Sequence, residues 1–386
     1  MATGGSRFQK ARSFVREYTA GIRSRDLHRL FRQDASEAFQ VLTRDQPAVP
    51  PEAKGIRAFF QRARILFLGL SYTLTPARRL LFALAMLLAL TGSCVVRYQV
   101  HGREVQVGAG TMPLLLAIVL LVFLLALELV DRIRVRDELQ VARELQGQIL
   151  PREAPEVTGY RFAHSYRTAN EVGGDYYGFR TLADGRLVLV AGDASGHGIA
   201  AGLLMVIAHA TIDLAIGLDP RPEKVAPLIN KAIASAGGRR SFFTLFYALL
   251  DPSTGHMDYL CAGHPFPLLR RAGGQVVELG RGALPLGVRS TIQPRPDAVT
   301  LEPGDLLLLY SDGLAEQVQP ASGEAFGFDR VRDLVAAGGS AAELHRRLLA
   351  AFDAFLGDAP RGDDVSLVVV ERRADPGRSD RADLVA

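Results

Sequence analysis

The sequence predicts an α+β fold, a β-sandwich flanked by helices, preceded by two transmembrane helices and a helical linker. Three observations carry this prediction. Two long apolar runs lie in the first third of the chain, an apolar stripe at helical spacing follows the second run, and short β-like runs between glycine-rich turns fill the remainder. Strands joined by short turns, with helices gathered in separate blocks, are typical of an α+β fold rather than of alternating βαβ units.

The composition is that of a folded chain of about two domains. Of its 386 residues, 48% are hydrophobic and 22% are charged, which excludes a wholly disordered protein. Only two cysteines occur, Cys94 and Cys261. A disulfide framework and a thiolate metal site are therefore not expected.

Residues 1–79 form a predicted basic region, with 15 Lys+Arg against 6 Asp+Glu. We expect no nucleic-acid binding, because this region contains no recognisable nucleic-acid-binding motif. Residues 65–74 within it are apolar but too few to span a bilayer. They are either an interfacial helix on anionic lipid or a packed amphipathic helix.

Residues 80–130 are predicted to form a two-helix transmembrane hairpin. Its spans, 80–96 and 112–130, contain no charge and one charge, Glu128, respectively. At 1.5 Å per residue they reach about 25 and 28 Å, against a hydrocarbon core of roughly 30 Å. The alternative is a pair of buried core helices. Arginines flank the outer ends of the hairpin, so the positive-inside rule places both termini and the C-terminal domain in the cytoplasm.

Residues 131–153 are predicted to be a helical linker. Apolar residues recur there at spacings of three and four, at Val135, Leu139, Ala142, Leu145 and Ile149. This stripe either docks on the chain's own C-terminal domain or forms a short parallel coiled coil that joins two protomers in a homodimer.

Residues 154–372 form the predicted C-terminal domain, followed by a flexible tail at 373–386. Strands are predicted at 187–191, 242–250, 257–261, 267–270, 306–310 and 365–370, and helices at 199–216, 223–236 and 341–355.

Aspartates stand at the ends of predicted strands in this domain. Asp175 follows two glycines, Asp193 and Asp312 each directly follow a strand, and the pair Asp363–Asp364 precedes the last one. Each alone is an ordinary turn residue. Together they would repel one another unless cations lay between them, and oxygen ligands select Mg²⁺ or Mn²⁺. Two such ions roughly 3.5 to 4 Å apart can activate water against a phosphate ester.

Six ordered motifs resemble one protein family. In order they are GGDYY at 173–177, GDASGHG at 192–198, AGHP at 262–265, LPLG at 284–287, YSDGLAE at 310–316 and GDDVSLVVV at 362–370. They resemble the SpoIIE/RsbU-type branch of the 2C-type, metal-dependent serine/threonine protein phosphatases. The helix ending in LQGQILP is similar to the one that introduces such domains, so the resemblance covers about residues 137–371.

The resemblance implies a dinuclear Mn²⁺ or Mg²⁺ site at one end of the sandwich. Asp193 would bridge both ions, and the Ala194 carbonyl would bind one. Asp175, Asp312 and Asp363 would complete the ligands. Asp363 is preferred to Asp364, because the first aspartate of that motif is the one bound in the family. Catalysis through Asp193, Asp175 and Asp312 would then need no side-chain nucleophile, since activated water attacks phosphorus in line.

The resemblance also implies a substrate and a location. The substrate would be phosphoserine or phosphothreonine on a regulatory protein, typically an anti-sigma-factor antagonist of the STAS class, and the enzyme would be anchored in a bacterial inner membrane. His197 is a candidate general acid or phosphate contact, and Arg167 is a candidate phosphate contact. A turn histidine and a solvated arginine are the alternatives for these two, and His264 is interpreted as structural.

Two other functions are suggested by parts of the sequence. A membrane-tethered module that binds a phosphoprotein without hydrolysing it is the alternative to an enzyme. GGDYY also resembles the GG(D/E)EF signature of diguanylate cyclases, but those enzymes need an acidic residue where this chain has Tyr176.

Overall fold

The computed structural model describes residues 56–93, 95–100, 103–108, 111–236, 241–320 and 322–373. Most of the predicted basic region, Cys94 and the predicted tail after residue 373 lie outside these ranges. The chain divides into two compact units, residues 1–133 and 134–386, and each is described by itself.

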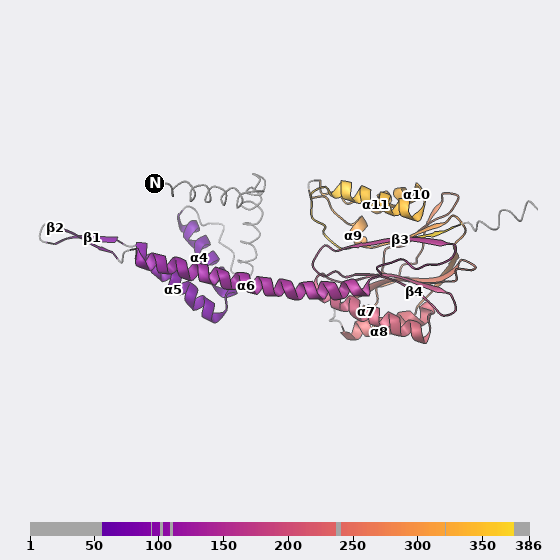
Figure 1. Cartoon of the computed structure of the whole chain (residues 1–386), viewed down its shortest axis with the longest axis horizontal. Helices are drawn as coiled ribbons and strands as arrows, with labels where there is room; N and C mark the ends of the chain where they lie inside the picture. Colours follow the sequence, from indigo (N-terminus) through magenta and orange to yellow (C-terminus); the bar gives the residue numbers. More distant parts are fainter. Residues whose placement is uncertain are drawn as a thin grey trace, which may run out of the picture. The chain divides into compact units, whose positions relative to one another are not determined.

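The described residues of the N-terminal unit form three helices and a β-hairpin (Figure 1). The helices are α4 (Ile56–Thr73), α5 (Pro76–Ser93) and the first part of α6 (Met112–Ile149), and strands β1 (Val95–Val100) and β2 (Arg103–Gly108) pair antiparallel between α5 and α6. The predicted span 80–96 is thus helical only to Ser93, because its last residues, Val95 and Val96, begin β1. The connecting segment is a two-stranded ribbon rather than a plain turn.

Two described helices, α6 and α7 (Ile199–Leu218), are long and apolar enough to cross a membrane by length and composition. The apolar window of α6 is 11% buried, whereas that of α7 is 44% buried. Because α7 packs on the strands of the C-terminal unit, its apolar character is that of a core helix. The predicted second span, in α6, therefore remains a candidate membrane span. The predicted first span lies in α5, which does not meet the same criteria of length and apolar composition.

The single charge in the second predicted span has a partner. Arg78 at the start of α5 forms ion pairs with Glu128 at 2.8 Å and with Asp131 at 2.7 Å, both on α6. One guanidinium thus pairs with two carboxylates where α5 meets α6.

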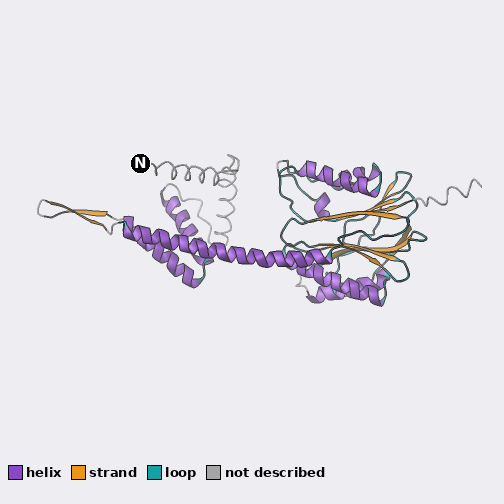
Figure 2. Cartoon of the chain, viewed as in Figure 1, coloured by secondary structure: helices purple, strands orange, loops and turns teal. Residues whose placement is uncertain are grey.

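The C-terminal unit contains two five-stranded antiparallel sheets (Figure 2). The first has the order β10-β7-β6-β5-β4, and the second has the order β3-β12-β11-β8-β9. The strands are β3 (Tyr160–Arg167), β4 (Asp175–Thr181), β5 (Leu187–Ala194), β6 (Phe243–Leu250), β7 (His256–Ala262), β8 (Leu268–Arg270), β9 (Val276–Glu278), β10 (Asp297–Thr300), β11 (Leu306–Tyr310) and β12 (Val365–Arg372).

Successive side chains along the strands of the second sheet point alternately into two hydrophobic cores. On β11, Leu307 and Leu309 belong to the core shared with the first sheet, while Leu306 and Leu308 belong to a second core under the helices. Both faces of the strand are buried, so β11 reads as a continuous run of leucines instead of an alternating pattern. The sheets therefore pack as the predicted sandwich.

Helices cover the outer face of each sheet (Figure 1). The first sheet carries α7 and α8 (Pro222–Ala236), and the second carries α10 (Phe328–Ala336) and α11 (Ala341–Leu356), with the one-turn α9 (Asp312–Ala315) at the end of β11. The α+β sandwich is confirmed. All six predicted strands and three predicted helices are present with small shifts at their ends, whereas β3, β4, β9, β10, α9 and α10 were not predicted.

The predicted linker is helical to Ile149 as the continuous second part of α6. Ile149 and Leu150 pack against the core of the C-terminal unit. Farther back on the same stripe, Val135 is 56% exposed and Leu145 is 58% exposed. The end of the stripe therefore docks on its own domain, whereas Val135 and Leu145 face outward within this unit.

Candidate metal centre

Asp175 and Asp193 lie directly opposite each other in the β4–β5 ladder. Asp175 is buried, with 1% of its surface exposed, and Asp193 is half-buried. Gly174 makes this arrangement possible, because a Cβ there would lie 2.8 Å from the Ala194 carbonyl oxygen and 2.9 Å from Asp193 Oδ1. The glycine pair thus lets the chain before Asp175 run close beside Asp193 and Ala194.

The second sheet supplies the other two carboxylates. Asp312 begins α9, with one residue between it and the end of β11, and Asp363 precedes β12, the strand paired with β11. Gly313 allows the close approach here, since a Cβ on it would collide with the Asp364 carbonyl oxygen and come within 3.2 Å of Asp363 Cβ. The ends of both sheets therefore bring together aspartates that lie far apart in the sequence.

Burial and mutual repulsion raise the pKa values of these carboxyl groups. The pKa of Asp175 is raised by burial and then by the charge of Asp193. Burial, with Asp312 and Asp363, raises the pKa of Asp193 to about 8, and burial with Asp363 raises that of Asp312 to about 6. A cluster in which charge is so disfavoured binds either protons or a cation.

The adjacent aspartates Asp363 and Asp364 have different surroundings. The Asp364 carboxylate is buried and accepts hydrogen bonds from the backbone amides of Ala169 at 2.8 Å and Gly174 at 2.7 Å. Asp363 is exposed, and its Oδ1 accepts a hydrogen bond from the Asp364 amide at 2.8 Å. Asp364 thus fastens the glycine loop, whereas Asp363 keeps lone pairs directed to solvent.

The donor set fits a hard divalent cation. Every side chain in the cluster offers oxygen, and Asp175 Oδ2 is buried without a hydrogen-bond partner. Within the described ranges, no group of three or more His, Cys, Asp or Glu side chains could hold one ion. Magnesium does not need such a group, since it keeps several waters and takes one or two carboxylates. Asp193 with the Ala194 carbonyl, or with Asp175, meets that requirement.

Thr244 and His264 support Asp193 from behind. The Thr244 hydroxyl accepts a hydrogen bond from the Asp193 amide at 2.9 Å, and His264 Nδ1 lies 2.9 Å from the same hydroxyl. Burial lowers the pKa of His264 to about 3, so its imidazole is neutral at ordinary pH. The AGHP motif therefore has the structural role that the sequence suggested for His264.

The two candidate phosphate contacts have different positions. His197 is exposed and lies near enough to Asp363 for its charge to lower the pKa of that carboxyl group, against the larger raising effect of burial. Arg167 instead forms an ion pair with Asp353 of α11 at 2.5 Å. The fold brings His197 to the carboxylate cluster and ties Arg167 to α11.

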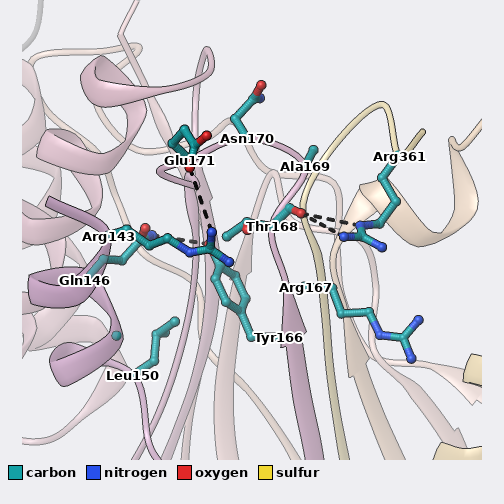
Figure 3. A pocket seen from close by; sticks show the side chains of 11 residues that line it. Arg143, Gln146, Leu150, Tyr166, Arg167, Thr168, Ala169, Asn170, Glu171 and Arg361 are labelled. Carbon is teal, nitrogen blue, oxygen red and sulfur yellow. Dashed lines mark hydrogen bonds and ion pairs between the residues drawn. The ribbon is translucent and has the colours of Figure 1, made fainter. Parts of the chain in front are cut away.

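A cavity of about 660 Å³ lies beside the glycine loop (Figure 3). Its walls come from the end of α6, from β3 and the loop after it, and from Arg361. One of its residues, Gln146 of α6, bonds both backbone groups of Gly173. Sequence reasoning missed Gln146 and Thr244. The only available signal was the LQGQILP resemblance, which marked the helix without assigning a role to any residue.

Comparison with known proteins agrees with this architecture. Residues 183–373 match the family model described as Stage II sporulation protein E (SpoIIE). This chain carries a SpoIIE-type domain. The matched segment contains Asp193, Asp312 and Asp363, and the pairing of β4 with β5 adds Asp175 from just before it.

Relatives of the SpoIIE domain share its fold. The SiaA-PP2C domain of Pseudomonas aeruginosa has a TM-score of 0.56 at 24% identity, covering 64% of this chain and 99% of that one. The RsbU and RsbW domains of Rv1364c from Mycobacterium tuberculosis give a TM-score of 0.50 at 29% identity, with 60% and 70% covered.

One relative found by sequence similarity is named for an enzymatic activity. The phosphoserine phosphatase RsbP of Bacillus subtilis is 24% identical over 210 residues, which cover 52% of this chain and 50% of RsbP. The chain spans about half the length of the curated relatives that it matches.

Proposed function

We propose that the SpoIIE domain is a metal-dependent phosphatase that hydrolyses phosphoserine or phosphothreonine on a regulatory protein. The observation that carries this proposal is the opposed pair Asp175 and Asp193 on one sheet, with Asp312 and Asp363 supplied by the other. Four carboxyl groups with raised pKa values at one end of a sandwich are poorly explained as structural groups, because burial disfavours the ionisation of each and neighbouring carboxylates add to that effect.

In this proposal Asp193, the Ala194 carbonyl, Asp175, Asp312 and Asp363 would be the protein ligands of two Mn²⁺ or Mg²⁺ ions. Bound divalent ions supply Lewis acidity for the phosphoryl oxygens and a lowered pKa for attacking water. Thr244 fixes the backbone of Asp193, and Asp364 fixes the loop before Asp175. His197, exposed beside Asp363, is our candidate for donating a proton to the leaving serine or threonine oxygen.

The substrate and location extend the proposal. The name of RsbP supports phosphoserine, and the SpoIIE/RsbU resemblance supports a STAS-class anti-sigma-factor antagonist as the protein that carries it. The apolar, outward-facing first part of α6 supports anchoring in a bacterial inner membrane, with both termini and the SpoIIE domain in the cytoplasm. The exposed stripe at Val135 and Leu145 supports a homodimer through the linker.

The test uses the full chain in detergent and a phosphoserine STAS protein. Phosphate release is measured with and without Mn²⁺ for the wild type, for Asp193→Asn and for the matched control Asp184→Asn. Asp184 lies in the β4–β5 turn, where it pairs with its neighbour Arg186. We expect Mn²⁺-dependent release that Asp193→Asn abolishes and Asp184→Asn retains.

Other outcomes separate the alternatives. Full Mn²⁺-dependent activity of Asp193→Asn would overturn the two-metal mechanism. Capture of the phosphoprotein without release, by protein that binds Mn²⁺, would favour the non-catalytic binding module.

A further inference from the structure

A cavity of about 750 Å³ lies along β7, apart from the one beside the glycine loop. Four consecutive residues of β7, 259–262, line it. Successive side chains of a strand point to opposite faces of its sheet, so four residues in a row can border one cavity only along the edge of the strand. The cavity therefore lies against the backbone of β7.

This part of the β7 edge has no partner strand. β10 pairs with β7 only as far as Tyr259, which lies opposite Asp297 at the start of β10. Beyond Tyr259, no other strand in the described ranges pairs with β7 on the side away from β6. Farther along the chain the edge is closed by Pro285, with which a Cβ on Gly263 would collide. An open edge remains at residues 260–262, about 10 Å long.

Three arginines line the same cavity, Arg281, Arg289 and Arg295. Arg281 forms an ion pair at 2.6 Å with Asp297, the one acidic residue of the lining. Arg289 and Arg295 are exposed, and neither forms an ion pair with a carboxylate of the part of the chain that the structure describes. The cavity thus presents two uncompensated positive charges beside an open strand edge.

The loop that carries Arg289 is fixed from α8. Asn230 of α8 is 1% exposed, and its Nδ2 donates a hydrogen bond to the Arg289 carbonyl at 3.0 Å. Its Oδ1 accepts one from the Gly287 amide at 2.8 Å. Leu286 also pairs with Phe243 at the start of β6. This wall of the cavity is therefore built without a ligand, which lowers the ordering cost of binding one.

The open edge lies close to the carboxylate cluster. His264, two residues after Ala262, lies within hydrogen-bond distance of Thr244, whose hydroxyl accepts the Asp193 amide hydrogen. A strand added to β7 would stand three strand spacings from β5, about 15 Å, which roughly four or five extended residues cross. A segment bound at this edge and a phosphorylated residue at the cluster can therefore belong to one substrate chain.

We propose that this cavity binds an extended, acidic segment of the phosphoprotein substrate as an additional strand on the edge of β7. The inference rests on the proposed function and names a part of the substrate that the domain recognises. The open edge at 260–262 supplies main-chain hydrogen bonds, and Arg289 and Arg295 pair with acidic side chains of the segment. A small anion would satisfy the arginines and leave the strand edge open, so a peptide fits the cavity better.

The test uses the full chain in detergent with Mn²⁺ and synthetic phosphopeptides. Each peptide contains a three-residue segment, a spacer of six glycine and serine residues, and a phosphoserine, in either order along the peptide. The segment is acidic Glu-Val-Glu, neutral Gln-Val-Gln or basic Lys-Val-Lys. The KM of each peptide is measured from phosphate release.

We expect the KM of the acidic peptide to lie about tenfold below that of the neutral one, because hydrogen bonds between charged groups are stronger than neutral ones. A one-residue spacer should remove the difference, since it cannot cross about 15 Å. Arg289→Glu and Arg295→Glu should reverse the order, so that the basic peptide has the lowest KM. Arg346→Glu, at an exposed position on α11, is the matched control and should keep the wild-type order.

Methylated peptides test strand addition separately from charge and need no change in the protein. In an extended Glu-Val-Glu segment, the valine amide points to one edge and the two glutamate amides point to the other. Methylation of the amides on one of these edges should therefore remove the advantage of the acidic peptide. An advantage that both methylated forms retain would overturn strand addition, and equal KM values for all three segments would overturn the site itself.

The two proposals fail separately. Fluorescence anisotropy of labelled, unphosphorylated peptides with the same three segments measures binding without hydrolysis. If the wild type releases no phosphate from any peptide but binds the acidic probe more tightly than the basic one, the proposed function is wrong and the site on β7 is retained. Phosphate release with no preference among the segments retains the function and rejects the site.

Discussion

Thr244 lies directly opposite Asp193 across the β5–β6 pair, and its hydroxyl accepts the Asp193 amide hydrogen at 2.9 Å. On the other edge of β5, Asp193 faces Asp175. The central aspartate is thus held by a neutral hydroxyl on one neighbouring strand and opposed by a carboxylate on the other. This asymmetry defines which side of the strand can accept a cation.

Thr244→Val should destabilise the domain. The change keeps the branched shape but leaves a buried Asp193 amide without its acceptor, which costs about 1–3 kcal/mol. Thr300→Val, at an exposed position on β10, is the matched control and should stay within about 0.5 kcal/mol. The measurement is thermal melting of the full chain in detergent. Equal melting temperatures for the two variants would show that the Thr244 hydroxyl contributes little.

Stability without metal should depend on pH in a defined direction. The pKa of Asp193 is raised to about 8 in the fold, from about 3.9 in an unfolded chain. A raised pKa means that the proton stabilises the fold, and this contribution is lost as pH rises through the folded value. In EDTA, the melting temperature should therefore fall between pH 6 and 8, and Asp193→Asn should flatten this slope.

Metal binding should show the opposite trend. A cation must displace the proton, so the apparent Mn²⁺ affinity should rise with pH between 6 and 8, by about tenfold per unit for each proton released. Calorimetry in buffers of different ionisation enthalpy measures that proton release. Binding that is independent of pH would mean that Asp193 is already ionised in the free protein.

Asp363 and Asp364 should behave differently when each is changed to asparagine. Asp363→Asn should weaken Mn²⁺ binding with little change in melting temperature, because that carboxylate is exposed. Asp364→Asn should lower the melting temperature, since an amide group can accept only one of the two backbone hydrogen bonds and the loss costs about 1–3 kcal/mol. The reverse pattern would make Asp364 the ligand.

Leu145→Lys should separate protomers if the linker stripe forms a dimer. A charge at this exposed apolar position cannot be buried between two helices without a partner. Gln140→Lys, on another face of α6, is the control. Light scattering of the full chain in detergent gives the mass. A wild-type protein that is monomeric at every concentration would remove the coiled-coil proposal.

The sequence predicted the strands whose two faces are both buried, and it did not predict β3 and β4, in which polar and apolar residues are mixed. The leucine run of β11 and the valine run of β12 are strong strand signals because both of their faces are covered. β4 starts with an aspartate and contains Gly178, and β3 alternates imperfectly between polar and apolar residues, so neither has a clear period. α10 is short and carries four charges in nine residues. Tertiary pairing, not local preference, forms these elements.

Some residues of the candidate site could likewise be predicted from the sequence, and others could not. Aspartates at strand ends beside glycine are visible in the sequence because the turn chemistry surrounds them. The roles of Thr244 and Gln146 are not visible in the sequence. The role of Thr244 depends on the pairing of β6 with β5, and that of Gln146 depends on where α6 ends. The different surroundings of Asp363 and Asp364 depend on the backbone amides of Ala169 and Gly174, which lie about 190 residues earlier in the sequence.

The position of β12 also bears on how the protein is made. β12 lies between β3 and β11, and the bond from Ala169 to Asp364 closes a separation of 195 residues. While the ribosome is still adding the intervening residues, β3 and β11 each have an open edge, and contacts this distant form slowly. A partly synthesised domain that lacks residues 363–372 therefore leaves both edges unpaired and cannot hold the complete carboxylate cluster.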